Sequence, residues 1–136
     1  MITMIFGAGG FAREVHFLMR RLEAAGNKGK DSGPVAGFVA APGDPSVGQS
    51  IKGIPVIGED TFFTEYAGQE INCFVAVGAP GLKQKITAAL QRHIKPRFPV
   101  LVDPSVILDE ENGGVQMGQG CIVCAGTILT TDITLG

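Results

Sequence analysis

The chain has 136 residues, of which 45% are hydrophobic and 18% are charged, and its formal net charge is −2. These values fit about one globular domain and exclude a disordered chain. They also argue against nucleic acid as a partner, because binding it needs a concentrated basic face and the longest basic run is Arg20-Arg21.

The sequence also bears on the compartment. No apolar stretch approaches the roughly 18 residues of a membrane span. The opening MITMIFGAGG has neither the basic leader nor the cleavage site of a signal peptide. Three cysteines, an odd number without the spacing of a disulfide framework, favour a reducing environment. We therefore expect a cytoplasmic protein with no membrane partner.

The apolar pattern predicts strands and helices in alternation. The expected elements are a strand at 2–6, a helix at 11–25, a strand at 35–40, an edge or connecting segment at 51–57, a short helix at 60–66, a strand at 73–77, a helix at 81–93 and a strand at 98–102. This order is that of an open parallel α/β sheet. The residues expected to face the core from the helices are Phe11, Val15, Leu18, Met19, Leu22, Phe62, Phe63, Tyr66, Leu82, Ile86 and Leu90.

A different period begins after Asp103-Pro104, where we place a domain boundary. Met117, Val123, Leu129 and Leu135 follow one another at six-residue intervals. A six-residue period is typical of a β-helix, in which each hexad forms one short strand and one turn. Such repeats need about three stacked units to bury their apolar face. Because residues 105–136 contain only about one coil, we expect them to form only the start of a β-helix domain.

The strongest chemical signal lies between the first strand and the first helix. Gly7, Gly9 and Ala12 fit the pattern G-x-G-x-x-G/A. Gly7 permits a tight turn, Gly9 lets backbone approach a ligand, and Ala12 lets the helix pack on the sheet. Free N–H groups at the positive helix end then form a site for phosphate. A tight turn alone would also explain these glycines, but the strand before and the helix after favour phosphate or nucleotide binding.

A dinucleotide site needs one further residue. An Asp or Glu is expected after the second strand, about twenty residues past the motif, to hold the ribose of NAD. Ala40 and Ala41 stand there instead, and the first acid is Asp44. No basic residue there favours NADP. An NAD-linked oxidoreductase is therefore disfavoured.

Four segments in order, GAGGFAREV, GFV, GIPVIG and VAVG, precede the hexads. Together they resemble the sugar O/N-acyltransferases, which include sialic acid O-acetyltransferases and the UDP-amino-sugar N-acetyltransferases of bacillosamine synthesis. The resemblance implies a Rossmann-like domain at 1–104 that binds a nucleotide sugar, typically UDP-linked. It implies the first coil of a left-handed β-helix at 105–136, a domain that forms homotrimers in the family and holds acetyl-CoA between subunits.

By position, the resemblance also assigns the residues that would meet the substrate. They are Gly7, Gly9, Gly10, Phe11, Arg13, Gly78 and Ala79. The sequence departs from the family pattern at two places. Ala40 and Ala41 replace acids that relatives often carry, and Asp103-Pro104 stands where relatives often have His-Pro.

The catalytic residue is the largest departure. The family's general base is a β-helix histidine that deprotonates the acceptor amine or hydroxyl so that it attacks the acetyl thioester. The two histidines here, His16 and His93, lie outside the hexads and are expected to be structural or solvated. We assign no catalytic residue and expect no acetyl transfer by these 136 residues. A non-catalytic nucleotide-binding module is the alternative function from another class.

Three further groups carry weaker signals. Cys121 and Cys124 form C-x-x-C, but no second Cys or His pair follows, so we interpret them as structural rather than as a redox or zinc site. The acids at 109–111 are interpreted as a solvated turn, and no metal site is expected. Lys83 and Lys85 either help to bind an anion near Gly78 or form a plain exposed helix face.

Overall fold

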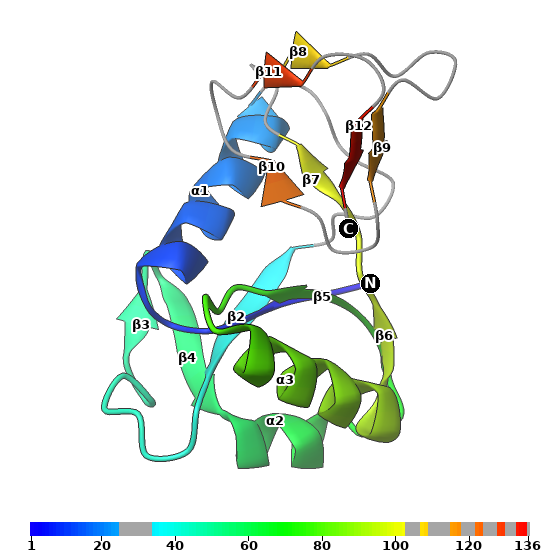
Figure 1. Cartoon of the computed structure of the whole chain (residues 1–136). Coiled ribbons are helices and arrows are strands. Elements are labelled where there is room, and N and C mark those ends of the chain that lie inside the picture. The colour runs from blue at the N-terminus through cyan, green and yellow to red at the C-terminus, as the bar shows by residue number, and fades with distance from the viewer. Residues whose placement is uncertain are drawn as a thin grey trace.

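The computed structural model describes residues 1–24 and 34–102 and, beyond them, the backbone of five short strands. In chain order the first elements are β1 (Thr3–Phe6), α1 (Gly10–Ala24), β2 (Val35–Ala40), β3 (Ser50–Ile51), β4 (Ile54–Gly58), α2 (Glu59–Glu65), β5 (Glu70–Val75), α3 (Pro80–His93), β6 (Lys95–Arg97) and β7 (Leu101–Val102). Figure 1 shows the main sheet with helices on both of its faces.

The main sheet has six strands in the order β3-β4-β2-β1-β5-β6. Every neighbouring pair is parallel except the β3–β4 hairpin. The chain progresses from β1 through β2 to β4 on one side and then returns to place β5 and β6 on the other. The strand order therefore reverses between β1 and β5, and open α/β sheets bind ligands outside the carboxyl ends of strands at such a switch point. The predicted α/β class with a parallel sheet is confirmed.

Each face of the sheet has its own core because successive side chains of a strand point to opposite faces. Ile5 packs in one cluster with Val15 and Leu18 of α1. Met4 and Phe6, its neighbours in β1, lie in the other cluster, which contains the buried residues of α2 and α3. Helix α1 thus covers one face, and α2 and α3 cover the other (Figure 1).

Two predicted core residues are exposed. Phe11 is 38% and Leu82 is 42% accessible to solvent. Both lie in the first turn of their helices, at the end of the sheet where the strands before them have already stopped. The helical period identified the correct stripe, but it does not show where the sheet beneath that stripe ends. Phe63 of α2 and Tyr66, which follows the helix as its C-cap, are half-buried, whereas Phe62 is fully buried.

The predicted strand at 98–102 is wrong for most of its length. The chain instead forms β6 at Lys95–Arg97 and β7 at Leu101–Val102, with no strand at 98–100. Strand β6 lies at the edge of the sheet, where Pro96 is tolerated and side chains are partly or fully exposed. Its sequence therefore lacks the apolar run expected of a buried parallel strand, and the apolar residues that follow gave a misleading signal.

The prediction of an edge or connecting segment at 51–57 is wrong for the part that forms β4. Strand β4 is internal to the sheet, and the two-residue strand β3 forms the edge. Pro55 faces Ser50 of this minimal edge strand, while β4 pairs with β2 from Val56 onwards. Pro55 therefore precedes the part of β4 that pairs with β2, and it is tolerated in an inner strand.

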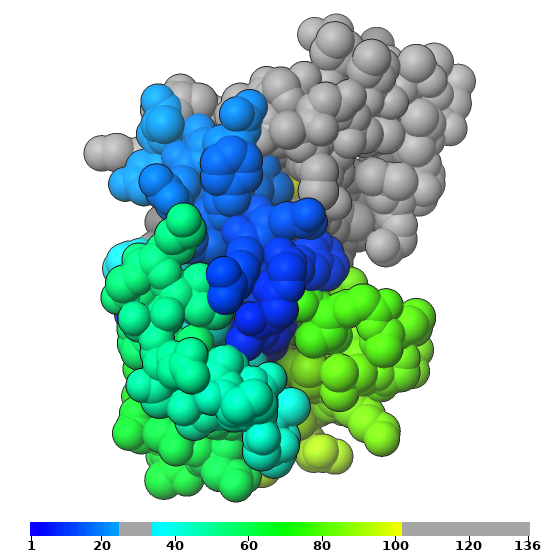
Figure 2. All heavy atoms as spheres, turned by 90° about the vertical axis from the view of Figure 1, so that its left-hand side faces the viewer, coloured from blue at the N-terminus to red at the C-terminus, as the bar shows by residue number. Residues whose placement is uncertain are grey.

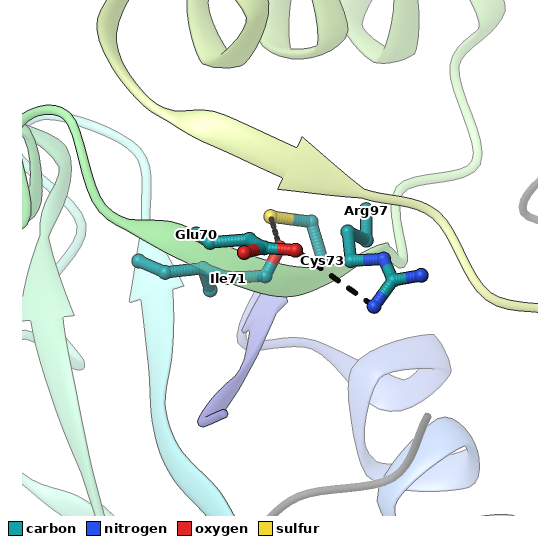
Figure 3. A network of polar contacts seen from close by, with 4 residues as sticks. All are labelled: Glu70, Ile71, Cys73 and Arg97. Atoms are coloured by element: carbon teal, nitrogen blue, oxygen red, sulfur yellow. Dashed lines mark hydrogen bonds and ion pairs between the residues drawn. The ribbon is translucent and has the colours of Figure 1, made fainter. Parts of the chain in front are cut away.

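The β5–β6 border carries one surface ion pair, shown in Figure 3. Arg97 Nη1 lies 3.8 Å from Glu70 Oε1, and both side chains are more than half exposed. Such a pair contributes about 0–1 kcal/mol. Nearby, the Cys73 thiol donates to the carbonyl of Ile71 at 3.5 Å. Cys73 is completely buried, as expected for a core residue, and this burial raises the pKa of its thiol to about 12.

The remaining strands are β8 (Ile107–Leu108), β9 (Val115–Met117), β10 (Ile122–Val123), β11 (Ile128–Leu129) and β12 (Ile133–Leu135). They form parallel pairs, with β10 on β7, β11 on β8 and β12 on β9. Strands β10, β11 and β12 thus each pair with the strand three before them in the chain. The predicted boundary at Asp103-Pro104, the acids at 109–111 and the pair Cys121 and Cys124 lie outside the described residues.

Candidate functional site

The loop between β1 and α1 is fixed by one glycine. Gly7 has φ +126°, a conformation that favours glycine, and its N–H donates to the carbonyl of Val39 at 2.8 Å. A Cβ at Gly7 would lie only 2.6 Å from the carbonyl oxygen of Ala76. The N–H of Ala76 in turn donates to the carbonyl of Phe6 at 2.8 Å. Gly7 therefore allows this loop to pass directly over the end of β5.

The next two glycines are not required by the turn. Neither Gly9 nor Gly10 has positive φ, and a Cβ built on either would meet nothing within 4 Å. The protein's own packing thus leaves room for side chains at both positions, yet the sequence has none. The absence of side chains leaves the backbone at the start of α1 open to close approach from outside.

A second helix begins at the same edge of the sheet. Val75 at the end of β5 is in register with Phe6 at the end of β1, and α3 starts five residues after Val75. Its N-cap residue, Ala79, makes no side-chain hydrogen bond to the helix. The first turns of α1 and α3 contain no acid, whereas α2 carries Glu59 and Asp60 in its first turn. The unpaired N–H groups and positive dipole ends of α1 and α3 therefore both favour an anion.

The predicted binding residues fall at this edge. Gly7, Gly9, Gly10 and Phe11 follow β1, and Gly78 and Ala79 follow β5, so the structure brings the two groups to the switch point. Arg13 is exposed in the first turn of α1. Figure 2 views this edge, with the start of α1 in dark blue between the β3–β4 region at lower left and α3 at right.

The acid nearest to the end of β2 is already engaged. Asp44 Oδ1 accepts hydrogen bonds from the Ser46 hydroxyl at 2.6 Å and from the Ser46 N–H at 2.8 Å. These two bonds lower the pKa of the Asp44 carboxyl. Asp44 thus stabilises its own loop, and the position of a ribose-binding acid after β2 is filled by Ala40, which is buried, and Ala41.

The sequence did not identify an acid that directly follows the neighbouring strand β4. Gly58 ends β4 in register with Ala40 of β2, and Glu59 follows it directly. Partial burial, and secondarily the charge of Asp60, raise the pKa of the Glu59 carboxyl. A carboxyl group therefore follows β4, the strand next to β2, at the level where β2 ends. Glu59 is visible in the sequence as an acid after an apolar segment. Its position beside the end of β2 follows only from the pairing of β2 with β4.

The histidines lie away from this edge. His16 is buried under α1, with its ring 5.8 Å from that of Phe38 in an edge-to-face contact. Burial, followed by the charges of Arg20 and Lys52, lowers the pKa of His16. His93 is the last residue of α3, and the centroid of its ring lies 5.0 Å from that of Phe63. Because α3 has 14 residues, His93 lies about 20 Å along the helix from its N-terminus.

Within residues 1–24 and 34–102, no group of three or more His, Cys, Asp or Glu is placed to hold a metal ion. The described helices include none with the length and apolar character needed to cross a bilayer.

Comparison with known proteins identifies the family. The sequence model of the PglD N-terminal domain matches residues 3–90. The chain belongs to the PglD N-terminal domain family. No curated protein matches the sequence.

Solved structures show the same fold over nearly the whole chain. A mutant of perosamine N-acetyltransferase from Caulobacter crescentus, in complex with CoA and GDP-perosamine, is 25% identical with a TM-score of 0.70. The acetyltransferase domain of PglB from Neisseria gonorrhoeae, in complex with acetyl coenzyme A, is 23% identical with a TM-score of 0.64. WeeI from Acinetobacter baumannii is 23% identical with a TM-score of 0.68.

The matched lengths differ between this chain and these structures. The alignments cover 98% of this chain for the perosamine enzyme and WeeI and 99% for PglB. They cover 56%, 59% and 61% of the perosamine enzyme, WeeI and PglB chains, respectively. This chain therefore spans less than two thirds of their length.

The family model and the structural matches together confirm the predicted membership of a sugar acetyltransferase family.

Proposed function

We propose that these 136 residues form the nucleotide-sugar-binding part of an acetyl-CoA-dependent sugar N- or O-acetyltransferase. The observation that carries this proposal is the open backbone at Gly9 and Gly10, which neither the turn nor the packing requires. It lies at the switch point of the sheet, where ligands bind in this architecture. Family membership and the GDP-perosamine bound by the Caulobacter enzyme support the same ligand class.

The proposed ligand is a nucleoside diphosphate joined to a sugar. Its diphosphate would accept hydrogen bonds from the N–H groups in the first turn of α1 and lie near the start of α3. Arg13 and Lys83, each in the first turn of its helix, add positive charge. UDP is the carrier that the sequence resemblance implies, and GDP is the carrier in the Caulobacter complex. The shared diphosphate chemistry is what these residues would recognise.

NAD is a poorer ligand for this edge. Ala40 and Ala41 offer no carboxylate to the ribose, and the Asp44 carboxylate is bound by Ser46. Glu59 stands beside this position but follows a different strand. These features support a nucleotide sugar over a dinucleotide cofactor.

For residues 105–136 we propose the beginning of a left-handed β-helix, following a Rossmann-like domain at 1–104. Ile122 pairs with Leu101, Ile128 with Ile107, and Ile133 with Val115. Pairing at intervals of three short strands is expected when one triangular coil stacks on the next. The six-residue spacing supports the same architecture. We propose that this part forms a homotrimer, and that acetyl-CoA binds there in a longer assembly of the family type.

We further propose that these residues do not transfer acetyl on their own. His16 is buried between α1 and the sheet, and His93 lies at the opposite end of α3 from the proposed ligand. Neither is placed to take a proton from an acceptor at the switch point.

We also propose a cytoplasmic location, and the buried free thiol of Cys73 is consistent with it.

Calorimetric titration of the 136-residue chain tests the ligand class. UDP-N-acetylglucosamine, GDP-mannose, NAD and acetyl-CoA are the probes, and we expect binding of at least one sugar nucleotide and none of NAD. Gly9→Val fills the open space without straining φ, so it should weaken that binding at least tenfold while keeping the melting temperature. Glu23→Val, in the last turn of α1, is the matched control and should bind normally. Binding of NAD alone, or undiminished binding by Gly9→Val, would refute the proposal.

A further inference from the structure

We propose that His16, Arg20 and Lys52 form a site for a small tetrahedral oxyanion, a phosphate or sulfate group, on the flank of α1. This is a second site, and it does not depend on the function proposed above. His16 and Arg20 lie one turn apart on α1, and Lys52 lies in the turn between β3 and β4. Figure 2 shows the β3–β4 region directly below α1 on one face of the molecule.

The β3–β4 hairpin is held against α1 by apolar contacts. Ile51 and Ile54, which flank the turn, pack in the same core cluster as Val15 of α1. Lys52 lies between these two isoleucines, and His16 directly follows Val15. The packing of the hairpin on the helix therefore brings the two basic side chains to one flank of α1.

Lys52 stands at a position where the turn geometry favours another residue. Lys52 has φ 52° and Gly53 has φ 79°, both positive, as in a two-residue hairpin turn of type I′. Asn or Gly is preferred at the first of these positions. In the described part of the chain, Lys52 is the one residue other than glycine with a positive φ. The backbone gains nothing from a lysine here, so its charge is the property that needs a function.

His16 is a buried base whose ring nitrogens have no partner. Its side chain is 8% exposed, and the ring makes an edge-to-face contact with Phe38 of β2. Within the described residues it makes no hydrogen bond, and its nitrogens are not among the fully buried unpaired atoms. They therefore retain access to solvent, and in the protonated ring both can donate to an anion.

The charges around this ring are positive. Burial, followed by the charges of Arg20 and Lys52, lowers the pKa of His16. Both cations are exposed, and neither forms an ion pair within residues 1–24 and 34–102. Phe38, which packs on the ring from β2, carries no charge. An anion between the two cations would be attracted by both and would favour the protonated form of His16.

The burial of His16 also limits the size of the ligand. An extended polyanion could contact Arg20 and Lys52 at the surface, but it could not reach a ring that is 8% exposed. A tetrahedral oxyanion is compact and offers one oxygen to each of the three donors. Charge-assisted hydrogen bonds of this kind are the stronger class. The three residues therefore fit a single phosphate or sulfate group best.

NMR of the imidazole resonances provides the direct test. Sulfate is the probe because its charge does not change between pH 5 and pH 8, and sodium chloride at equal ionic strength is the reference. Sulfate should raise the pKa of His16, and by linkage it should bind more tightly at pH 6 than at pH 8. The second histidine, His93, provides a control resonance that sulfate should not affect. A His16 titration that is identical in the two salts would overturn the proposal.

Variants separate the proposed site from a structural role of the lysine. Lys52→Asn suits the turn, so it should keep or raise the melting temperature. It should nevertheless weaken sulfate binding about fivefold or more, through the loss of one charge-assisted hydrogen bond. Lys85→Gln, an exposed substitution on α3, is the matched control and should bind sulfate normally. Undiminished binding by Lys52→Asn would refute the site.

Two further arms locate the anion and identify its source. Gly9→Val fills the start of α1 and should leave the sulfate response of His16 intact. Loss of the response in Gly9→Val but not in Lys52→Asn would place the anion at the start of α1 and overturn the proposal. At pH 8, inorganic phosphate is compared with glycerol 3-phosphate. Tighter binding of either one by the wild-type chain, lost in Lys52→Asn, supports the site and distinguishes a free ion from a phosphate ester.

Discussion

Gly7 and Gly9 show how neighbouring glycines of one motif have different physical roles. Gly7 is required by its positive φ and by the approach of the Ala76 carbonyl, whereas Gly9 meets neither constraint. The motif was visible in the sequence, but this division was not. It depends on where β5 ends relative to β1, which is a contact between segments about 70 residues apart in the chain.

Replacing Gly7 should therefore affect folding, and replacing Gly9 should not. Gly7→Ala puts a Cβ into the Ala76 carbonyl and a side chain at unfavourable φ, so we expect a loss of about 2–4 kcal/mol in the free energy of unfolding. Gly9→Ala is the matched control, with an expected change within about 0.5 kcal/mol. Urea denaturation measures both. Equal destabilisation by the two variants would contradict this assignment.

The buried thiol gives a second prediction for a single residue. With a pKa of about 12, Cys73 is almost entirely protonated at pH 8 and is also inaccessible. Iodoacetamide should leave it unmodified in the native chain and alkylate it in urea, because the thiolate is the reactive form. Mass spectrometry of the peptide that contains Cys73 provides the measurement. Rapid native labelling would show that β5 opens readily.

At the scale of elements, the packing of α1 includes a buried base. The folded-state pKa of His16 is lowered, so the unfolded chain binds a proton at a higher pH than the folded chain does. The stabilising contribution of neutral His16 is therefore complete above the unfolded pKa of about 6.5 and declines as pH falls towards the lower folded value.

The corresponding experiment compares pH 7.5 with pH 5.5. The wild-type chain should lose more stability across this interval than His16→Gln does, because the variant has no imidazole to protonate. Measuring the free energy of unfolding at both pH values isolates the difference from the other titrating groups. An identical loss in the two proteins would show that His16 is protonated in the folded state as readily as in the unfolded state.

Helix α2 depends on a single aromatic anchor. The ring of Phe62 is fully buried, 5.0 Å from that of Phe6 and 5.3 Å from that of Tyr66. Phe62→Ala should reduce the free energy of unfolding by about 3–5 kcal/mol, the usual cost of such a cavity. Phe17 of α1 is 56% exposed, and Phe17→Ala should change the free energy of unfolding by less than about 1 kcal/mol. Similar losses in both variants would contradict the assigned core.

The elements differed in how well the sequence predicted them. Helices α1 and α3 and strand β2 were found close to their true bounds, because each buries one continuous apolar stripe or run. Strand β6 was missed because an edge strand with exposed side chains has no such pattern. The placement of Glu59 beside β2 was not predictable either, since it follows from the pairing of Gly58 with Ala40. Periodicity reports burial within an element and does not specify which elements become neighbours.

At the scale of the whole molecule, the parallel pairs formed by β7–β12 connect to assembly. Two-stranded sheets this short leave backbone groups at their edges that invite further pairing. If the proposed homotrimer forms, light scattering after size-exclusion chromatography should give three times the 14.2 kDa mass of one chain. A mass of 14.2 kDa at micromolar concentration would contradict the trimer, and it would leave the proposed ligand site, which uses residues of one chain, unaffected.

The hydrogen bond from Ala76 to Phe6 has a consequence for natural variation in chain length. It fixes the two loops of the proposed site directly, through adjacent strands, although more than sixty residues of sequence separate them. Insertions or deletions in the surface loop at 41–49 should therefore leave the spacing of the backbone amides in the proposed anion site unchanged. Homologous chains can then carry different loops on that side of the sheet and keep the backbone contacts of the proposed phosphate site.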